Sequence, residues 1–149
     1  MKKSNFFIKM LIIFFLYNSI GAAKESSYFI EGKKYFEKKE FDKSKILFER
    51  DLVFNPKSEK SYLFLAKIFK NDENDEEQEH NLNSVLLLNP ANDEAIYMLA
   101  LIKIKQSDYN QAKELIDRFS LVCKSFCSKK KEIEDKLEKL TPENAKNNN

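Results

Sequence analysis

The chain has 149 residues, among them 26 basic and 24 acidic side chains but only two glycines. Three of the basic residues, Lys2, Lys3 and Lys9, lie in residues 1–23, which contain no acid, so residues 24–149 hold 23 basic against 24 acidic side chains. This near-neutral balance argues against nucleic acid as a partner. The remaining residues are enough to bury one core, and without a long Ser/Gly linker we expect no second domain.

The first 23 residues are typical of a secretory signal peptide. Lys2 and Lys3 open the segment, an apolar run follows over residues 10–20, and small residues close it at Ala23. We predict cleavage after Ala23, because the run is too short for a transmembrane helix, which needs about 20 residues. An uncleaved N-terminal anchor is the alternative. The abundance of Lys, Asn, Ile and Phe indicates a bacterial source, so we expect export to the periplasm or cell surface, with no membrane span after cleavage.

From residue 26 onward, apolar residues recur at spacings of three and four, as in Leu65, Ile68 and Phe69. This spacing predicts amphipathic helices, each with one apolar face. Pro56 and Pro90, each preceded by Asn, are typical of a helix end followed by a turn. We therefore expect an all-α chain, with helices over residues 26–38, 42–54, 59–71, 75–88, 93–105, 109–122 and 129–140.

The predicted helices repeat with a period of 34 residues. Gly32, Ala66 and Ala100 keep this step, and small residues at such positions let two helices approach closely. The same step relates three further sets, namely Tyr28, Tyr62 and Ile96; Phe48, Leu82 and Ile116; and Pro56 with Pro90. A fixed period of this length indicates a solenoid.

The residue types at these positions resemble the tetratricopeptide repeat (TPR) family. The match in the first two units rests on Tyr28, Gly32, Tyr35, Ser44, Phe48 and Pro56, then on Tyr62, Leu65, Ala66, Phe69, Gln78, Leu82, Val85 and Pro90. The third unit is degenerate, with Lys103 in place of an aromatic and Lys124 in place of the proline. The resemblance implies a right-handed α-solenoid of helix-turn-helix units over about residues 25–58, 59–92 and 93–126. We also expect a capping helix over 129–140 and a disordered tail over 141–149.

In TPR proteins the first helix of each unit lines a concave groove, and the resemblance implies a partner groove here. The corresponding positions are Phe29, Lys33, Phe36 and Glu37, then Lys60, Leu63, Lys67 and Lys70, then Tyr97, Leu101, Ile104 and Lys105. If Phe29, Leu63 and Tyr97 are exposed, they form an apolar stripe flanked by lysines, suited to a partner segment with acidic character. The alternative is that some of these apolar residues pack between helices. The carboxylate clamp of some relatives would need Lys and Asn at Phe29 and Lys33, so that version is absent.

Cys123 and Cys127 are the only cysteines of a chain that we expect to be exported. Within one continuous helix their β-carbons would lie about 5–6 Å apart, whereas a disulfide needs about 3.5–4.5 Å. A bond therefore requires the helix to break, and the repeat places an inter-unit turn at these residues. We favour a disulfide that joins the cap to the third unit, with two reduced core thiols as the alternative.

The sequence carries no recognisable catalytic, cofactor or metal constellation. The acidic run over residues 72–79 has Glu77 where a calcium loop needs glycine, so we expect Asn74 or Asp75 to cap the next helix instead. His80 has no neighbouring nucleophile, and we expect it on the surface or at the edge of the groove. We therefore predict a protein that is not an enzyme.

Together these features predict an exported TPR scaffold or adaptor that assembles a bacterial envelope complex, such as machinery for outer-membrane biogenesis, secretion, pili or the periplasmic flagellar motor. Its partner would be a protein or peptide segment in the groove, or a subunit of a larger complex. Two alternatives stay open, a self-assembling structural subunit of an envelope machine and a regulator of a peptidoglycan enzyme. Fold alone does not decide between them.

Overall fold

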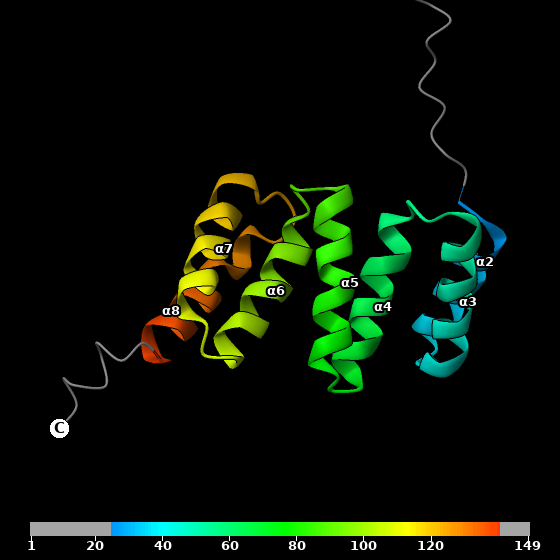
Figure 1. The fold of residues 1–149 in the computed structure, drawn as a ribbon, viewed down its shortest axis with the longest axis horizontal. Helices are drawn as coiled ribbons and strands as arrows, with labels where there is room; N and C mark the ends of the chain where they lie inside the picture. The colour runs from blue at the N-terminus through cyan, green and yellow to red at the C-terminus, as the bar shows by residue number, and fades with distance from the viewer. Residues whose placement is uncertain (1–24, 141–149) are drawn as a thin grey trace, which may run out of the picture.

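The computed structural model describes residues 25–140, and these residues form a row of α-helices without a strand (Figure 1). The helices are α2 (Ser27–Glu37), α3 (Phe41–Phe54), α4 (Glu59–Asn71), α5 (Asp75–Leu88), α6 (Asp93–Lys105), α7 (Tyr109–Val122), the 3-10 turn η1 (Cys127–Lys129) and α8 (Lys130–Leu140). Each lies within one residue of its predicted bounds, so the all-α prediction is confirmed. The predicted signal peptide and C-terminal tail lie outside the described residues. Within those residues, none of the helices has the length and apolar character needed to span a membrane.

The helices pair as α2 with α3, α4 with α5 and α6 with α7, which we call the first, second and third units. The units stand side by side, and α8 packs against α6 and α7 at one end of the row (Figure 1). Because successive helices alternate in direction, the turns between units lie at one edge of the row (Figure 1). We call this the inter-unit edge. The turns within units lie at the opposite, intra-unit edge.

Short polar side chains begin most of these helices. Ser26, Asn74, Asn92 and Asp108 each accept a hydrogen bond from the backbone N–H three residues later, at 2.8–3.2 Å. These bonds satisfy N–H groups that have no partner in the first helical turn. The acidic run over residues 72–79 therefore begins α5, with Asn74 as its cap.

Small residues set the distance between the helices of a unit. A Cβ added to Gly32 would lie 2.9 Å from Cε1 of Phe48, so no larger residue fits without movement. The Ser44 hydroxyl donates to the Gly32 carbonyl at 2.9 Å across the same contact. Ala66 and Ala100 occupy the equivalent place in the other units and are fully buried.

Each intra-unit turn contains one residue in the left-handed conformation. These residues are Lys39, Glu73 and Ser107, with φ of 61°, 55° and 62°. They lie 34 residues apart, so the same turn is used three times. Glycine adopts this conformation without steric cost, and none of the three is glycine.

The core consists of two clusters. An aromatic cluster joins the first unit to the second and contains Phe29, Phe48, Leu65, Ile68 and Phe69, with Phe36, Phe41, Leu52 and Phe64 packed against it. An aliphatic cluster joins the second unit, the third unit and α8, and it includes Leu82, Val85, Ile96, Ile116 and Ile133. Helix α4 takes part in both, since Leu65 faces the first cluster and Ala66 the second.

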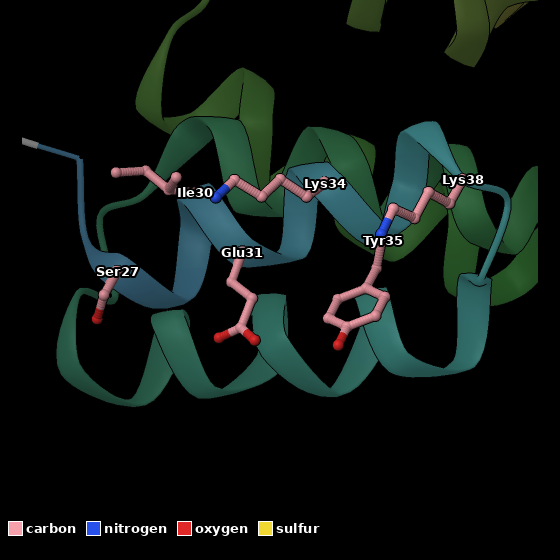
Figure 2. A pocket seen from close by; sticks show the side chains of 6 residues that line it. All are labelled: Ser27, Ile30, Glu31, Lys34, Tyr35 and Lys38. Atoms are coloured by element: carbon pink, nitrogen blue, oxygen red, sulfur yellow. The ribbon is translucent and has the colours of Figure 1, made fainter.

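The outer side of α2 is polar where the later units are apolar. A hollow there is lined by Ser27, Ile30, Glu31, Lys34, Tyr35 and Lys38 (Figure 2). In α4 the positions that correspond to Glu31 and Lys34 are Leu65 and Ile68, which are buried against the first unit. With Glu31 and Lys34 at these positions, Ile30 and Tyr35 are the only residues lining the hollow that carry a large apolar group, so this side of α2 lacks the buried pair by which α4 packs on the first unit.

Candidate protein-binding face

One side of α2, α4 and α6 collects most of the predicted groove positions. Their accessible members are Lys33, Phe36, Lys60, Leu63, Lys67, Lys70, Leu101 and Lys105, and we call this surface the inner face. Lys67 of α4 reaches Glu94 of α6 at 2.9 Å and lies 5.1 Å from the ring centre of Phe64. The side chains of neighbouring units thus touch along this face, which makes it one continuous surface.

Two of the three stripe residues are not exposed, so the expected apolar stripe is wrong in this part. Phe29 is only 4% exposed because it packs between Phe48 and Phe64, with ring centres 5.7 Å from each. Tyr97 is 7% exposed, and Ile104 of the same helix is also buried. Phe29, Tyr97 and Ile104 therefore pack between helices, which was the alternative expected from the sequence. The accessible apolar surface is limited to half-buried residues such as Leu63.

The charge of the inner face comes from five lysines. Lys33 lies 3.9 Å from Glu37. Lys60, Lys67 and Lys105 pair with acids at the margins of the face, which are Glu25, Glu94 and Asp75 respectively. Lys70 is exposed and makes no ion pair among residues 25–140. Exposed ion pairs contribute about 0–1 kcal/mol each, so Lys33, Lys60 and Lys105 can exchange their present partners for carboxylates of a ligand. The pair of Lys67 with Glu94 is less exposed.

Two hollows indent this side of the stack. One, of about 340 Å³, lies between α4, α5 and α6 and is lined by Lys70, Glu73, Asp75, Gln78, Met98, Leu101, Ile102 and Lys105. The other, of about 200 Å³, lies where α2, α3 and α4 meet and is lined by Glu25, Ser26, Phe29, Asp51, Asn55, Ser58, Glu59 and Lys60. The first hollow combines two lysines with the apolar side chains of Met98, Leu101 and Ile102, which is a combination that can take an amphipathic segment. The second hollow has one lysine, Lys60, among mostly polar and acidic side chains.

The capping helix packs against the third unit at the end of the row and covers Tyr97. The Tyr97 hydroxyl donates to Glu132 of α8 at 2.8 Å, and Lys129 and Lys136 donate to the same carboxylate at 2.9 and 3.2 Å. The hydrogen bonds from Lys129, Tyr97 and Lys136 lower the pKa of Glu132 to about 2. Burial, helped by the bond to Glu132, raises the pKa of Tyr97 to about 12. Tyr97 therefore anchors the cap and does not line an open groove.

Solved structures of other proteins match this arrangement. The TPR2B domain of yeast Sti1, solved as a complex with pHsp70, has a TM-score of 0.70 at 18% identity over 76% of this chain and 95% of that chain. The second TPR domain of human RPAP3, in complex with an HSP70 peptide, has a TM-score of 0.64 at 16% identity over 76% of this chain and 92% of that chain. The type III secretion chaperone SycD of Yersinia enterocolitica, in complex with a peptide of the translocator YopD, has a TM-score of 0.67 at 10% identity over 83% of this chain and 96% of that chain. This chain has the TPR fold. No protein-family model and no curated protein matches its sequence.

Within this TPR stack, an acidic residue at the start of the second and third units holds the turn that ends the unit. Glu59 accepts hydrogen bonds from the side-chain amides of Asn89 and Asn92 at 2.9 and 2.6 Å. Asp93 stands 34 residues after Glu59, and Glu25, which pairs with Lys60, stands 34 before it. The sequence analysis missed this series, although the subtraction that revealed the other repeats would have found it.

The third inter-unit turn wraps around Asp93. Three successive backbone N–H groups, of residues 124–126, donate to its Oδ2 at 2.7, 2.6 and 2.9 Å. Burial would raise the pKa of Asp93, but these backbone hydrogen bonds lower it below the usual value. Helix α7 ends at Val122, and Cys123 is joined to Cys127 by a disulfide with the Cα atoms 5.2 Å apart. The structure thus breaks the helix at the place where the predicted disulfide requires it.

Lys103, which replaces the expected aromatic residue of the third unit, takes part in a polar network. Its ammonium group donates to Glu79 of α5 and, at 3.0 Å, to Gln106. Gln106 in turn donates to the other oxygen of Glu79 at 2.8 Å. Burial would raise the pKa of Glu79, but the bonds from Lys103 and Gln106 lower it. The substitution therefore retains a tie between α5 and α6 with charge in place of an aromatic contact.

The remaining candidates from the sequence analysis take no part in a chemical site. His80 is exposed on α5, and its carbonyl accepts from the Ser84 hydroxyl at 3.2 Å. Among residues 25–140, no group of three His, Cys, Asp or Glu side chains is placed to hold a metal ion. The inner face is therefore the candidate binding surface of this protein.

Proposed function

We propose that this protein is an exported, non-enzymatic TPR adaptor that binds an acidic segment of a partner protein on its inner face and so assembles a complex of the bacterial envelope. The observation that carries this proposal is the band of five lysines across three helices, with half-buried Leu63 and Leu101 between them. A segment with carboxylates at intervals and a few apolar side chains complements such a surface.

The similar structures support the binding mode. The three named above were solved in complex with pHsp70, an HSP70 peptide or a peptide of YopD, so the fold is suited to holding a segment of another protein. Export rests on the residues of the predicted signal peptide. The envelope complex is our inference from export and the adaptor fold together.

A self-assembling subunit is less well supported. End-to-end stacking would need an apolar outer face on α2 or α8, and α2 presents Glu31 and Lys34 there. In α8 the apolar Ile133 is buried against the third unit, while charges such as Lys131 and Glu134 are exposed. Binding to a peptidoglycan enzyme would use the same inner face and would be one outcome of the test.

The test is photocrosslinking in living cells. A photoreactive residue at Leu63 on the inner face should capture one envelope protein, identified by mass spectrometry. The matched probe at His80 lies on the partner helix α5 of the same unit and is exposed. Capture from both positions, of nothing, or of further copies of this chain would contradict the proposal.

Charge reversal then tests the lysine band. Lys33→Glu with Lys70→Glu should weaken binding of the captured segment by about fivefold to thirtyfold, since each charge reversal should cost about 0.5–1 kcal/mol of binding free energy. Lys34→Glu with Lys38→Glu makes the same change of net charge on the outer side of α2 and should leave affinity unchanged. Binding should also weaken as salt rises. Equal losses in the two variants would show that net charge, and not the inner face, determines affinity.

A further inference from the structure

An exposed aliphatic side chain recurs near the end of the second helix of every unit. Val53, Leu87 and Leu121 stand 34 residues apart and are 76%, 84% and 86% exposed. Phe54 and Leu88, the next residues in the first two units, are exposed as well. We call these five residues the edge row. Scattered apolar residues on a surface are normal, but the same exposed position in three units forms a pattern.

The helices do not need Val53, Leu87 and Leu121 for their own packing. Helix α3 buries Ser44, Phe48 and Asp51, and Val53 follows Asp51 by two residues, about 200° around the helix. Val53 therefore points away from the core. Since these three side chains are 76–86% exposed, they bury little apolar surface within the chain and are free to contact a surface outside it.

The edge row lies at the inter-unit edge, where residues 1–24 join the described part of the chain. Glu25 lines the same hollow as Asn55 and Ser58 of the first inter-unit turn. Tyr28, in the first turn of α2, stacks on Phe54 with ring centres 5.7 Å apart. The apolar run over residues 10–20 is therefore connected to the protein beside the edge row.

We propose that the edge row rests on the surface of a phospholipid membrane. Five residue steps separate Ile20 from Glu25, and an extended chain spans about 3.6 Å per residue, so an uncleaved run would hold this edge within about 18 Å of the bilayer. If cleavage occurs after Ala23, Lys24 and the new α-amino group add positive charge directly before Glu25 in the sequence. In both forms the inter-unit edge faces the membrane and leaves the inner face free for a partner.

The charges at this edge suit lipid better than a second copy of the chain. The acids Glu25, Glu59 and Asp93 are already engaged by groups of the protein itself. Lys57 and Lys124 are exposed and make no ion pair within the described part of the chain. Apolar residues between such lysines are typical of surfaces that bind anionic membranes. A second copy docked on this edge would bring the same lysines against each other.

Two probes on one helix test the proposal in cells that express the full chain. Leu121 and Asn110 are both exposed on α7, and their spacing of 11 residues places them on one side of the helix, about 16 Å apart along its axis. A photoreactive residue at Leu121 should yield a phospholipid adduct, detected by mass spectrometry, at least about five times more abundant than at Asn110. An adduct with this chain or another protein, equal lipid adducts at both positions, or no adduct would overturn it.

A second variant separates the edge row from the N-terminal segment. With the probe kept at Leu121, Val53→Gln and Leu87→Gln should lower the lipid adduct at least about fivefold, because the apolar contact is lost from two units. Glutamine adds no charge at the helix ends, and both sites are exposed, so circular dichroism should show an unchanged fold. An undiminished adduct in this variant would also overturn the proposal, since the N-terminal segment alone would then account for it.

Discussion

At the first junction of the stack, Phe48 lies 5.7 Å from Phe29 in its own unit and stacks at 5.0 Å on Phe64 of the second unit. At the last junction, Ile133 of α8 is fully buried against the third unit in a cluster that is mostly aliphatic. The last junction also has the hydrogen bonds of residues 124–126 to Asp93 and the Cys123–Cys127 disulfide. The first junction has one buried polar tie, in which Asp51 accepts from Ser26 and Ser61.

The difference shows how a repeat stack can compensate for a weak repeat. The third unit lacks the proline and the aromatic residue of the other units, having Lys124 and Lys103 instead. A covalent link and charged hydrogen bonds supply the order that these residues would have given. Since each unit of a solenoid contacts only its neighbours, the two ends should lose structure independently.

The largest effect should come from the first junction. Phe48→Ala removes a fully buried ring and should lower the free energy of unfolding by about 3–5 kcal/mol. Hydrogen exchange should show protection lost in α2 and α3 and retained in α6 to α8. Ile133→Ala, which should cost about 2–5 kcal/mol, is the matched variant with the reverse pattern. An even loss of protection along the chain in both variants would mean that the junctions are coupled.

Removal of the disulfide should act on the last junction alone. Cys123→Ser with Cys127→Ser opens a loop of this length at a cost of about 2 kcal/mol, measured by urea unfolding. We expect the loss of protection in α8 and not in α2. A double-mutant cycle with Asp93→Asn should show coupling, because the loop that the disulfide closes supplies the three N–H donors. Strict additivity would show that the disulfide does not position these donors.

The cap should respond to pH through Tyr97 and Glu132. Tyr97→Phe should cost about 1 kcal/mol at pH 7 through loss of one hydrogen bond. Because the pKa of Tyr97 is raised from 10 to about 12 in the folded protein, its contribution is complete below pH 10 and is lost as pH rises towards 12. The stability difference between wild type and variant should shrink over that range.

The Glu132 carboxyl has a pKa shift of the opposite direction, so its contribution to stability is lost at low pH and not at high pH. Its pKa is lowered from 4.5 to about 2, so its contribution is present above pH 4.5 and is lost as pH falls towards 2.

A stability difference between wild type and Tyr97→Phe that stays constant from pH 7 to pH 12 would show that the phenol does not hold the cap as described. The aromatic cluster has no such group, so Phe48→Ala serves as the pH-independent control above pH 10.

The smallest expected effect is an equal gain in stability of the first and the third unit. Lys39→Gly and Ser107→Gly place glycine at φ of 61° and 62°, which should stabilise the first and third units by about 0.5–1 kcal/mol each. Thermal unfolding checks the gain, and hydrogen exchange checks its place. A gain in stability in only one of the two units would show that the cost of the left-handed backbone depends on the neighbouring junction and not on the turn alone.

Much of the fold follows from the sequence because helix periodicity, caps and turns are local. The spacing of apolar residues and the prolines at Pro56 and Pro90 place every helix within one residue of its observed bounds. The 34-residue step pairs the helices, and the spacing of Cys123 and Cys127 requires the helix end that the structure has at Val122.

Only the tertiary structure decided which inner-face residues are accessible. Phe29, Leu63 and Tyr97 share one offset in the repeat, yet Phe29 is covered by Phe64 of the next unit and Tyr97 packs against Phe126 and bonds to Glu132 of the cap. Leu63, in the middle unit, stays half-buried. The sequence period makes these positions equivalent, but burial depends on what lies beside each unit, and that differs between the ends and the middle of a short stack.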